Sequence, residues 1–132
     1  MPKKENKRKV GKWLFWTPRI FSILILLFLA LFSLDVFDSC NSFFSCLLAL
    51  FMHNLPVIIL LILFIIAWKK EIVGAWTFFL TGLLYLVLCL FRFINSSPRE
   101  YYMLTWPLII SLPLFIIGYL FWLNYKKKSR TQ

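Results

Sequence analysis

The sequence predicts an all-α integral membrane protein, a bundle of four transmembrane helices with a kinked second helix. Of its 132 residues, 61% are hydrophobic and 15% are charged, and the mean hydropathy is +0.82. An ordinary soluble domain has about 45–50% apolar and about 25% charged residues, and a short soluble chain cannot bury so much apolar surface. Four apolar segments are long enough to cross a hydrocarbon core, the first of them when its flanking residues are included. These observations exclude a soluble globular protein, a disordered chain and a disulfide scaffold, and predict one membrane domain over residues 1–132.

The first apolar run is Ile20–Leu34, which follows a basic tail placed at residues 1–17. The run alone rises only about 22 Å as a helix, so we extend the helix to residues 18–37, which span about 30 Å. Pro18 then occupies the first turn, where its missing N–H has little cost. No small-residue cleavage site follows the run, so we expect a retained helix rather than a signal peptide.

The second helix is predicted over residues 43–68, about 39 Å if fully helical. His53, Asn54 and Pro56 interrupt its apolar sequence. Proline removes a backbone hydrogen bond and clashes with the preceding turn, so a kink is expected at Pro56. The alternative is a short outer segment followed by a helix over Leu55–Trp68. We favour one long, kinked helix.

The third and fourth helices are predicted over residues 72–93 and 102–125, followed by a basic tail at residues 126–132. A tight turn at Lys69-Lys70-Glu71 precedes the third helix, and Asn95-Ser96-Ser97-Pro98 is a loop signal before the fourth. Pro113 should bend the fourth helix in mid-membrane. Gly74 and Gly82 lie eight residues apart on the third helix, and such small residues let helices approach closely.

The basic residues predict the orientation of the chain. It carries 15 Lys and Arg residues against 5 Asp and Glu, a net charge of +10. Four spans place both termini and the Lys69-Lys70 turn on one side, which collects all basic residues except Arg92 and Arg99. The positive-inside rule therefore predicts a multi-pass protein of the cytoplasmic membrane with both termini in the cytoplasm. The aromatic residues of the inner belt would be Trp13, Trp16, Trp68, Trp76 and Trp122.

The bilayer itself is the first predicted partner. Basic residues that flank spans attract anionic lipid headgroups, by on the order of 1 kcal/mol each near the surface. Nucleic acid is not expected as a partner, because the basic residues lie beside apolar runs and do not form a stripe along a soluble face. A second copy of the chain or another membrane protein is the remaining kind of partner.

A polar cluster is predicted at the outer level of the bundle. Ionisable groups within membranes are costly, so each is a functional candidate. The candidates are Asp35, Asp38, His53, Asn54 and Arg92, with Arg99 on the same side. One interpretation is a site open to the outside for a proton, an ion or a headgroup. The other, which we favour, is that these groups only fix helix packing.

A second polar feature is predicted at the inner face, where Arg19 and Glu71 should pair between the first and third helices. Exposed ion pairs contribute about 0–1 kcal/mol. The expected role of this pair is therefore to set the orientation of the helices.

Several kinds of chemistry lack the residues they need. One histidine cannot supply two axial haem ligands, and Cys40, Cys46 and Cys89 form no C-x-x-C for disulfide exchange or zinc. Of the three cysteines, we expect Cys40 alone near the oxidising side. No phosphate-binding loop or nucleophile motif occurs, and no carboxylate is expected at the middle of a span. We therefore expect no enzymatic activity, no metal and no cofactor.

Short motifs occur along the first half of the chain, namely Pro18-Arg19-Ile20, Ser33-Leu34-Asp35-Val36-Phe37, His53-Asn54-Leu55-Pro56, and Ala67-Trp68-Lys69 with Gly74. In these motifs the chain resembles a family of small, uncharacterised four-helix membrane proteins of bacteria and archaea, a domain of unknown function. The resemblance covers Phe15–Leu83, about half of the chain, and the fourth helix matches only as apolar sequence. The chain departs from the family where Ala75 replaces the second glycine of an expected pair. The resemblance implies a prokaryotic membrane protein with no assigned activity, and it draws attention to Asp35, His53 and Pro56.

Two functions remain open from the sequence. The first is a non-enzymatic structural or accessory component of the membrane. The second is a small transporter or channel that uses the outer polar cluster. A pore needs polar residues along its length, but Val57–Ala67 in the inner half of the second helix is entirely apolar. We therefore favour the accessory function.

Overall fold

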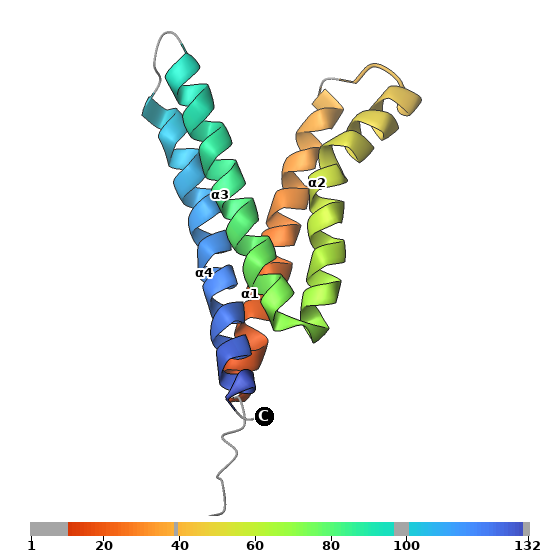
Figure 1. Cartoon of the computed structure of the whole chain (residues 1–132). Helices are drawn as coiled ribbons and strands as arrows, with labels where there is room; N and C mark the ends of the chain where they lie inside the picture. Colours follow the sequence, from red (N-terminus) through yellow and green to blue (C-terminus); the bar gives the residue numbers. More distant parts are fainter. Residues whose placement is uncertain (1–10, 39, 97–100, 131–132) are drawn as a thin grey trace, which may run out of the picture.

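The computed structural model describes residues 11–38, 40–96 and 101–130, and these residues form helices joined by short connections (Figure 1). The sequence prediction of an all-α chain with four potential spans is confirmed for this part of the chain, because four helices are long and apolar enough to cross a membrane. The helices are α1 (Lys12–Leu31), η1 (Phe32–Asp38), α2 (Phe43–Lys69), α3 (Glu71–Asn95), η2 (Tyr101–Leu104) and α4 (Thr105–Ser129), where η marks a 3-10 helix.

Two helices, α1 and α4, extend beyond their predicted bounds toward the ends of the chain. α1 begins at Lys12, six residues before the expected start, so Pro18 lies inside the helix and not in its first turn. α4 continues to Ser129, so the first lysines of the expected basic tail form its last turn. Lysine is a good helix former and favours the negative end of the helix dipole. α2, in contrast, agrees with the favoured prediction, because it runs through Pro56 as one helix without a separate outer segment.

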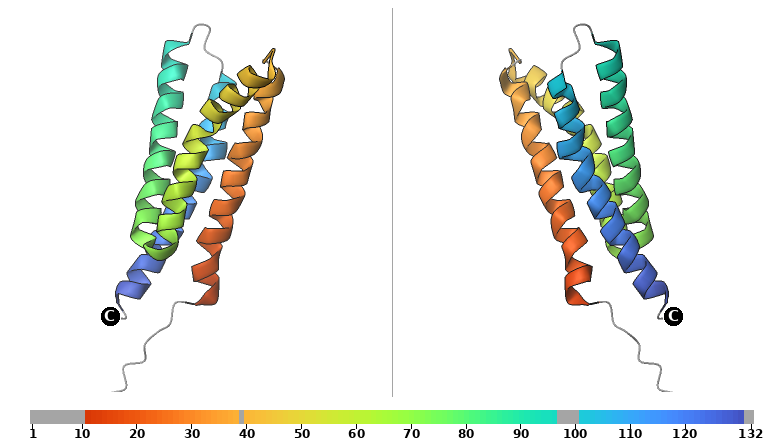
Figure 2. Two further views of the ribbon diagram at one scale, coloured as in Figure 1. Left: turned by 90° about the vertical axis from the view of Figure 1, so that its right-hand side faces the viewer. Right: turned by 90° about the vertical axis from the view of Figure 1, so that its left-hand side faces the viewer.

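The four helices meet most closely at one end of the molecule. This basic end carries the start of α1, the α2–α3 turn at Lys70 and the end of α4. At the opposite loop end, which carries the α1–α2 and α3–α4 connections, the α3–α4 pair diverges from the α1–α2 pair (Figure 1). Both views in Figure 2 show the helices running between these two ends. At the loop end, η1 nevertheless contacts α4 through the rings of Phe32 and Trp106, whose centroids are 5.8 Å apart.

α3 and α4 form the most extensive helix pair. Gly118 of α4 permits this approach, because a Cβ there would lie 3.1 Å from both Ala75 O and Phe79 N on the backbone of α3. Gly74 and Gly82 of α3 face aromatic side chains of α4 in the same way, as expected for small residues at a helix interface.

The core is aromatic and lies nearer the basic end. Phe64 of α2, Phe78 of α3 and Phe121 of α4 are almost fully buried. The Phe78 and Phe121 rings stack with their centroids 5.8 Å apart. In contrast, no residue of α2 before Leu60 and no residue of α3 after Gly82 is buried. The helices therefore leave long apolar faces uncovered toward the loop end.

Candidate functional site

A buried arginine is the centre of the polar site at the basic end. Arg19 has no solvent exposure, and its guanidinium lies 3.5 Å from the centroid of the Phe15 ring. Arg19 Nη2 donates to the Trp68 carbonyl at 3.0 Å, and Nη1 donates to the Phe15 carbonyl one turn earlier in α1. Because Trp68 is in the last turn of α2, the arginine side chain ties the start of α1 to the end of α2.

Glu71 brings α3 and α4 into the same network. Its Oε1 lies 3.7 Å from Arg19 Nη2, and its Oε2 lies 3.2 Å from Lys128 Nζ. Glu71 is buried, whereas the Lys128 side chain is half exposed. The two residues that the sequence suggested as an inner-face pair thus lie side by side, but the pair is buried and the sequence argument treated it as exposed. Burial makes the loss of either partner more costly than in a surface pair, because the remaining charge would be buried without compensation.

Asn124 explains how Pro18 is accommodated inside α1. A proline at position 18 has no N–H to donate to the Leu14 carbonyl, which is its normal partner four residues earlier. Asn124 Nδ2 of α4 donates to the Leu14 carbonyl instead. On the other side of the proline, Ser22 Oγ donates to the Pro18 carbonyl at 2.7 Å. A side chain of the last helix therefore replaces the hydrogen bond that the first helix lacks.

The charges at the basic end are directed at one another. A guanidinium stays protonated and cannot act as a proton donor in catalysis, and the Glu71 carboxylate already faces two cations. Arg19 Nε and Asn124 Oδ1 are buried without a hydrogen bond to the part of the chain that the structure describes. The arrangement is suited to holding the four helices together, since every helix contributes a side chain or a carbonyl to it.

The structure does not join the members of the predicted outer cluster. Asp35 and Asp38 are exposed on η1, His53 is exposed on α2, and Arg92 is exposed near the end of α3. Asn54 is half-buried and its Nδ2 donates to the Leu50 carbonyl at 3.1 Å, within its own helix. Among the described residues, no hydrogen bond or ion pair links two of these side chains, and no group of residues could hold a metal ion. Arg99 lies outside the described residues.

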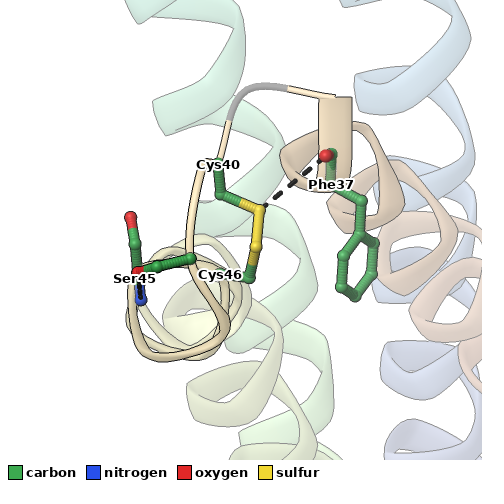
Figure 3. Close-up of a disulfide and its surroundings, with 5 residues drawn as sticks. Phe37, Cys40, Ser45 and Cys46 are labelled. Atoms are coloured by element: carbon green, nitrogen blue, oxygen red, sulfur yellow. Dashed lines mark hydrogen bonds between the residues drawn. A yellow bond between two sulfur atoms is a disulfide. The ribbon is translucent and has the colours of Figure 1, made fainter.

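A disulfide joins Cys40 to Cys46 at the loop end (Figure 3). Their Cα atoms are 5.1 Å apart, and Cys40 Sγ lies 3.8 Å from the Phe37 carbonyl oxygen. The expectation that Cys40 alone lies near this end was wrong, because α2 begins at Phe43 and places Cys46 in its first turns. Ser42 caps this helix, with its side chain accepting a hydrogen bond from Ser45 N at 3.3 Å. The disulfide therefore closes the α1–α2 connection onto the start of α2.

Asn124, Lys128 and the partner of Cys40 were not predicted from the sequence. Phe121, Asn124 and Lys128 follow each other at three- and four-residue steps, so they share one face of α4. An asparagine among the last apolar residues of the fourth run was the available signal for this face. For the cysteines, the signal was their separation of 6 residues across a short polar link.

The chain was compared with protein families, curated proteins and solved structures, and it matches one family. No curated protein and no solved structure matches the chain. One family model matches residues 6–132, so the match includes α4, which the short motifs did not cover. The chain therefore belongs to the family described as a domain of unknown function, DUF7670.

Proposed function

We propose that this chain is a prokaryotic multi-pass protein of the cytoplasmic membrane that acts as a non-enzymatic structural or accessory component. The main support for this proposal is the hydrophobic core near the basic end, which contains Phe64, Phe78 and Phe121. Leu114 and Ile117 of α4 extend this apolar packing along the helix. A transport path needs polar groups or water along its length, and an interior of packed aromatic rings offers neither.

Two observations support an orientation with both termini in the cytoplasm. The lysines of the described chain gather at the basic end, in the turn at Lys69 and Lys70 and in the last turn of α4. The Cys40–Cys46 disulfide lies at the opposite end. Basic flanks favour the cytoplasmic side, and stable disulfides favour an oxidising compartment. The basic residues and the disulfide are independent of each other, and both favour the same orientation.

We also infer that Pro56 and Pro113 bend their helices. Pro56 leaves the Met52 carbonyl without its usual donor, and Pro113 does the same to the Ile109 carbonyl. Both prolines lie well inside helices that are candidate spans. Bends at these positions would direct the outer part of α2 and the first turns of α4 independently of the packed basic end.

The apolar faces near the loop end support an accessory role. Phe51 of α2 and Leu88 of α3 are more than half exposed, in segments where no residue is buried. Lipid covers such faces in a lone chain, and a second helix surface covers them in an assembly. Membrane helices associate by close packing of their surfaces, since lipid tails are as apolar as leucine.

Purification in mild detergent at native expression level, followed by mass spectrometry, tests the proposal. A photo-reactive residue in place of Phe51 or Leu88 should cross-link a stoichiometric partner, either a second copy or another membrane protein. The control is the same residue in place of Trp13, which is 88% exposed at the basic end and should not capture that partner.

A lone chain without a cross-linked partner would contradict the accessory function. Ion or solute flux in liposomes would then be measured, with Asp35→Asn and His53→Ala as the first variants. Loss of a flux in Asp35→Asn, with folding unchanged, would establish the transporter alternative.

A further inference from the structure

We propose that one anionic diacyl phospholipid binds on α3 near the basic end, with one acyl chain on each side of Trp76 and its phosphate beside Lys70. The proposal rests on the placement of the chain in a membrane, which is part of the proposed function. It does not depend on an accessory role or on any protein partner.

Three hollows meet at a single residue, Ile72. One is a groove of about 370 Å³ between α2 and α3, which Leu63 and Thr77 line. The second is a groove of about 470 Å³ between α3 and α4, which Phe79 and Phe115 line. The third is a recess of about 240 Å³ at the end of the helices. Ile72 lines all three hollows, so they form one connected surface.

The two grooves lie on either side of a ridge on α3. Ile72 and Trp76 are four residues apart, so they stand on one face of the helix and line both grooves. Trp76 is 60% exposed and therefore projects between the grooves. From Ile72 to Phe79 the helix rises about 10 Å, which is about two thirds of the hydrocarbon thickness of one leaflet. Two parallel apolar grooves separated by a ridge match the two chains of a diacyl lipid.

The recess supplies the groups that recognise a phosphate. Lys70 and Lys128 line it, together with the hydroxyl-bearing side chains of Tyr125 and Ser129. Glu71 also lines it, but its carboxylate faces Arg19 and Lys128. Lys70, Lys128 and the adjacent Arg19 carry three positive charges against the one negative charge of Glu71. The surroundings of the recess are therefore net positive. Charge-assisted hydrogen bonds from lysine and hydroxyl groups are suited to a phosphate diester.

Native mass spectrometry of the purified full-length chain in detergent tests the proposal. The probes are phosphatidylglycerol and phosphatidylcholine with the same acyl chains, and lysophosphatidylglycerol with one chain. One phosphatidylglycerol should bind per chain, more tightly than either of the other two. Equal affinity for phosphatidylcholine would overturn the role of the recess. Equal affinity for the lysolipid would overturn the role of the second groove.

Two pairs of variants locate the site. Lys70→Ala should weaken phosphatidylglycerol binding about fivefold, the effect of one lysine near a membrane surface. Lys69→Ala, its neighbour that lines none of the three hollows, should change the affinity less than twofold. Trp76→Ala should weaken binding roughly threefold, because the acyl chains lose dispersion contacts that detergent replaces only in part. Trp13→Ala is its control. Equal losses within either pair would mean unspecific binding and would overturn the proposal.

The same assay distinguishes a lipid headgroup from free phosphate as the ligand of the recess. Inorganic phosphate at millimolar concentration should not displace bound phosphatidylglycerol. Displacement that also depends on Lys70 would assign the recess to a free phosphate and overturn the lipid site. Failure of the lipid site would leave the cross-linking test of the proposed function unaffected, because that test reports on the α2 and α3 faces near the loop end.

Discussion

At the level of single residues, the compensation of the Arg19 charge decides the stability of the basic end. Removing one partner of a buried ion pair costs about 3–5 kcal/mol, because it leaves an uncompensated charge. Glu71→Gln should therefore lower the free energy of unfolding by an amount in this range. Lys128→Ala removes the half-exposed partner of Glu71 and should cost only about 0–1 kcal/mol. Reversible unfolding in mixed micelles, followed by circular dichroism, measures both values.

The double variant Arg19→Leu/Glu71→Leu separates charge from packing. It removes both buried charges and replaces them with apolar groups, which is often neutral for stability. We expect it to be more stable than Glu71→Gln. Equal stabilities of Glu71→Gln and Lys128→Ala would show that Glu71 does not compensate the Arg19 charge.

A second residue-level prediction concerns Asn124 and Pro18. Asn124→Leu keeps the branched shape of the side chain, with added volume, but leaves the Leu14 carbonyl without a donor, which costs about 1–3 kcal/mol for a buried group. Pro18→Ala restores a backbone N–H that donates to the same carbonyl. The loss in Asn124→Leu should therefore be smaller in the Pro18→Ala background. A double-mutant cycle measures this coupling, and additive effects would contradict the exchange of one donor for the other.

At the level of elements, α3 and α4 depend on the absence of a side chain at position 118. In Gly118→Leu the new side chain would meet the backbone of α3, so the two helices must separate. Overpacking of this kind costs about 1–3 kcal/mol, and unfolding in mixed micelles should show the loss. Gly11→Leu is the matched control, because nothing lies within 4 Å of a Cβ at Gly11. A similar loss in both variants would point to a general effect of replacing glycine.

The existence of the four helices could be predicted because it depends on local sequence, namely four apolar runs of sufficient length. The start of α1 could not, because the cost of Pro18 within a helix is offset by Asn124, more than a hundred residues away in the chain. The burial of Arg19 depends in the same way on Trp68 and Phe121 of other helices. Residues that belong to a site through tertiary contacts leave little signal in their own segment.

At the level of the whole molecule, the charge distribution and the disulfide predict the same topology. The basic end carries lysines from three parts of the chain, so no single loop determines the orientation. A topology set by several flanks should be resistant to single changes. Lys69→Ala/Lys70→Ala should therefore leave the orientation unchanged, since the basic ends of α1 and α4 remain.

Accessibility of introduced cysteines measures the topology. In a background with Cys40, Cys46 and Cys89 replaced by serine, Asn41→Cys and Ser129→Cys place a thiol at exposed positions at opposite ends of the molecule. A membrane-impermeant maleimide should label Asn41→Cys in intact spheroplasts and Ser129→Cys only after permeabilisation. The reverse pattern would contradict the cytoplasmic termini. Labelling of both variants in intact spheroplasts would contradict an odd number of crossings between the two positions.

The wild-type chain, alkylated without reduction, should show Cys40 and Cys46 protected, because an oxidising outer side maintains their disulfide.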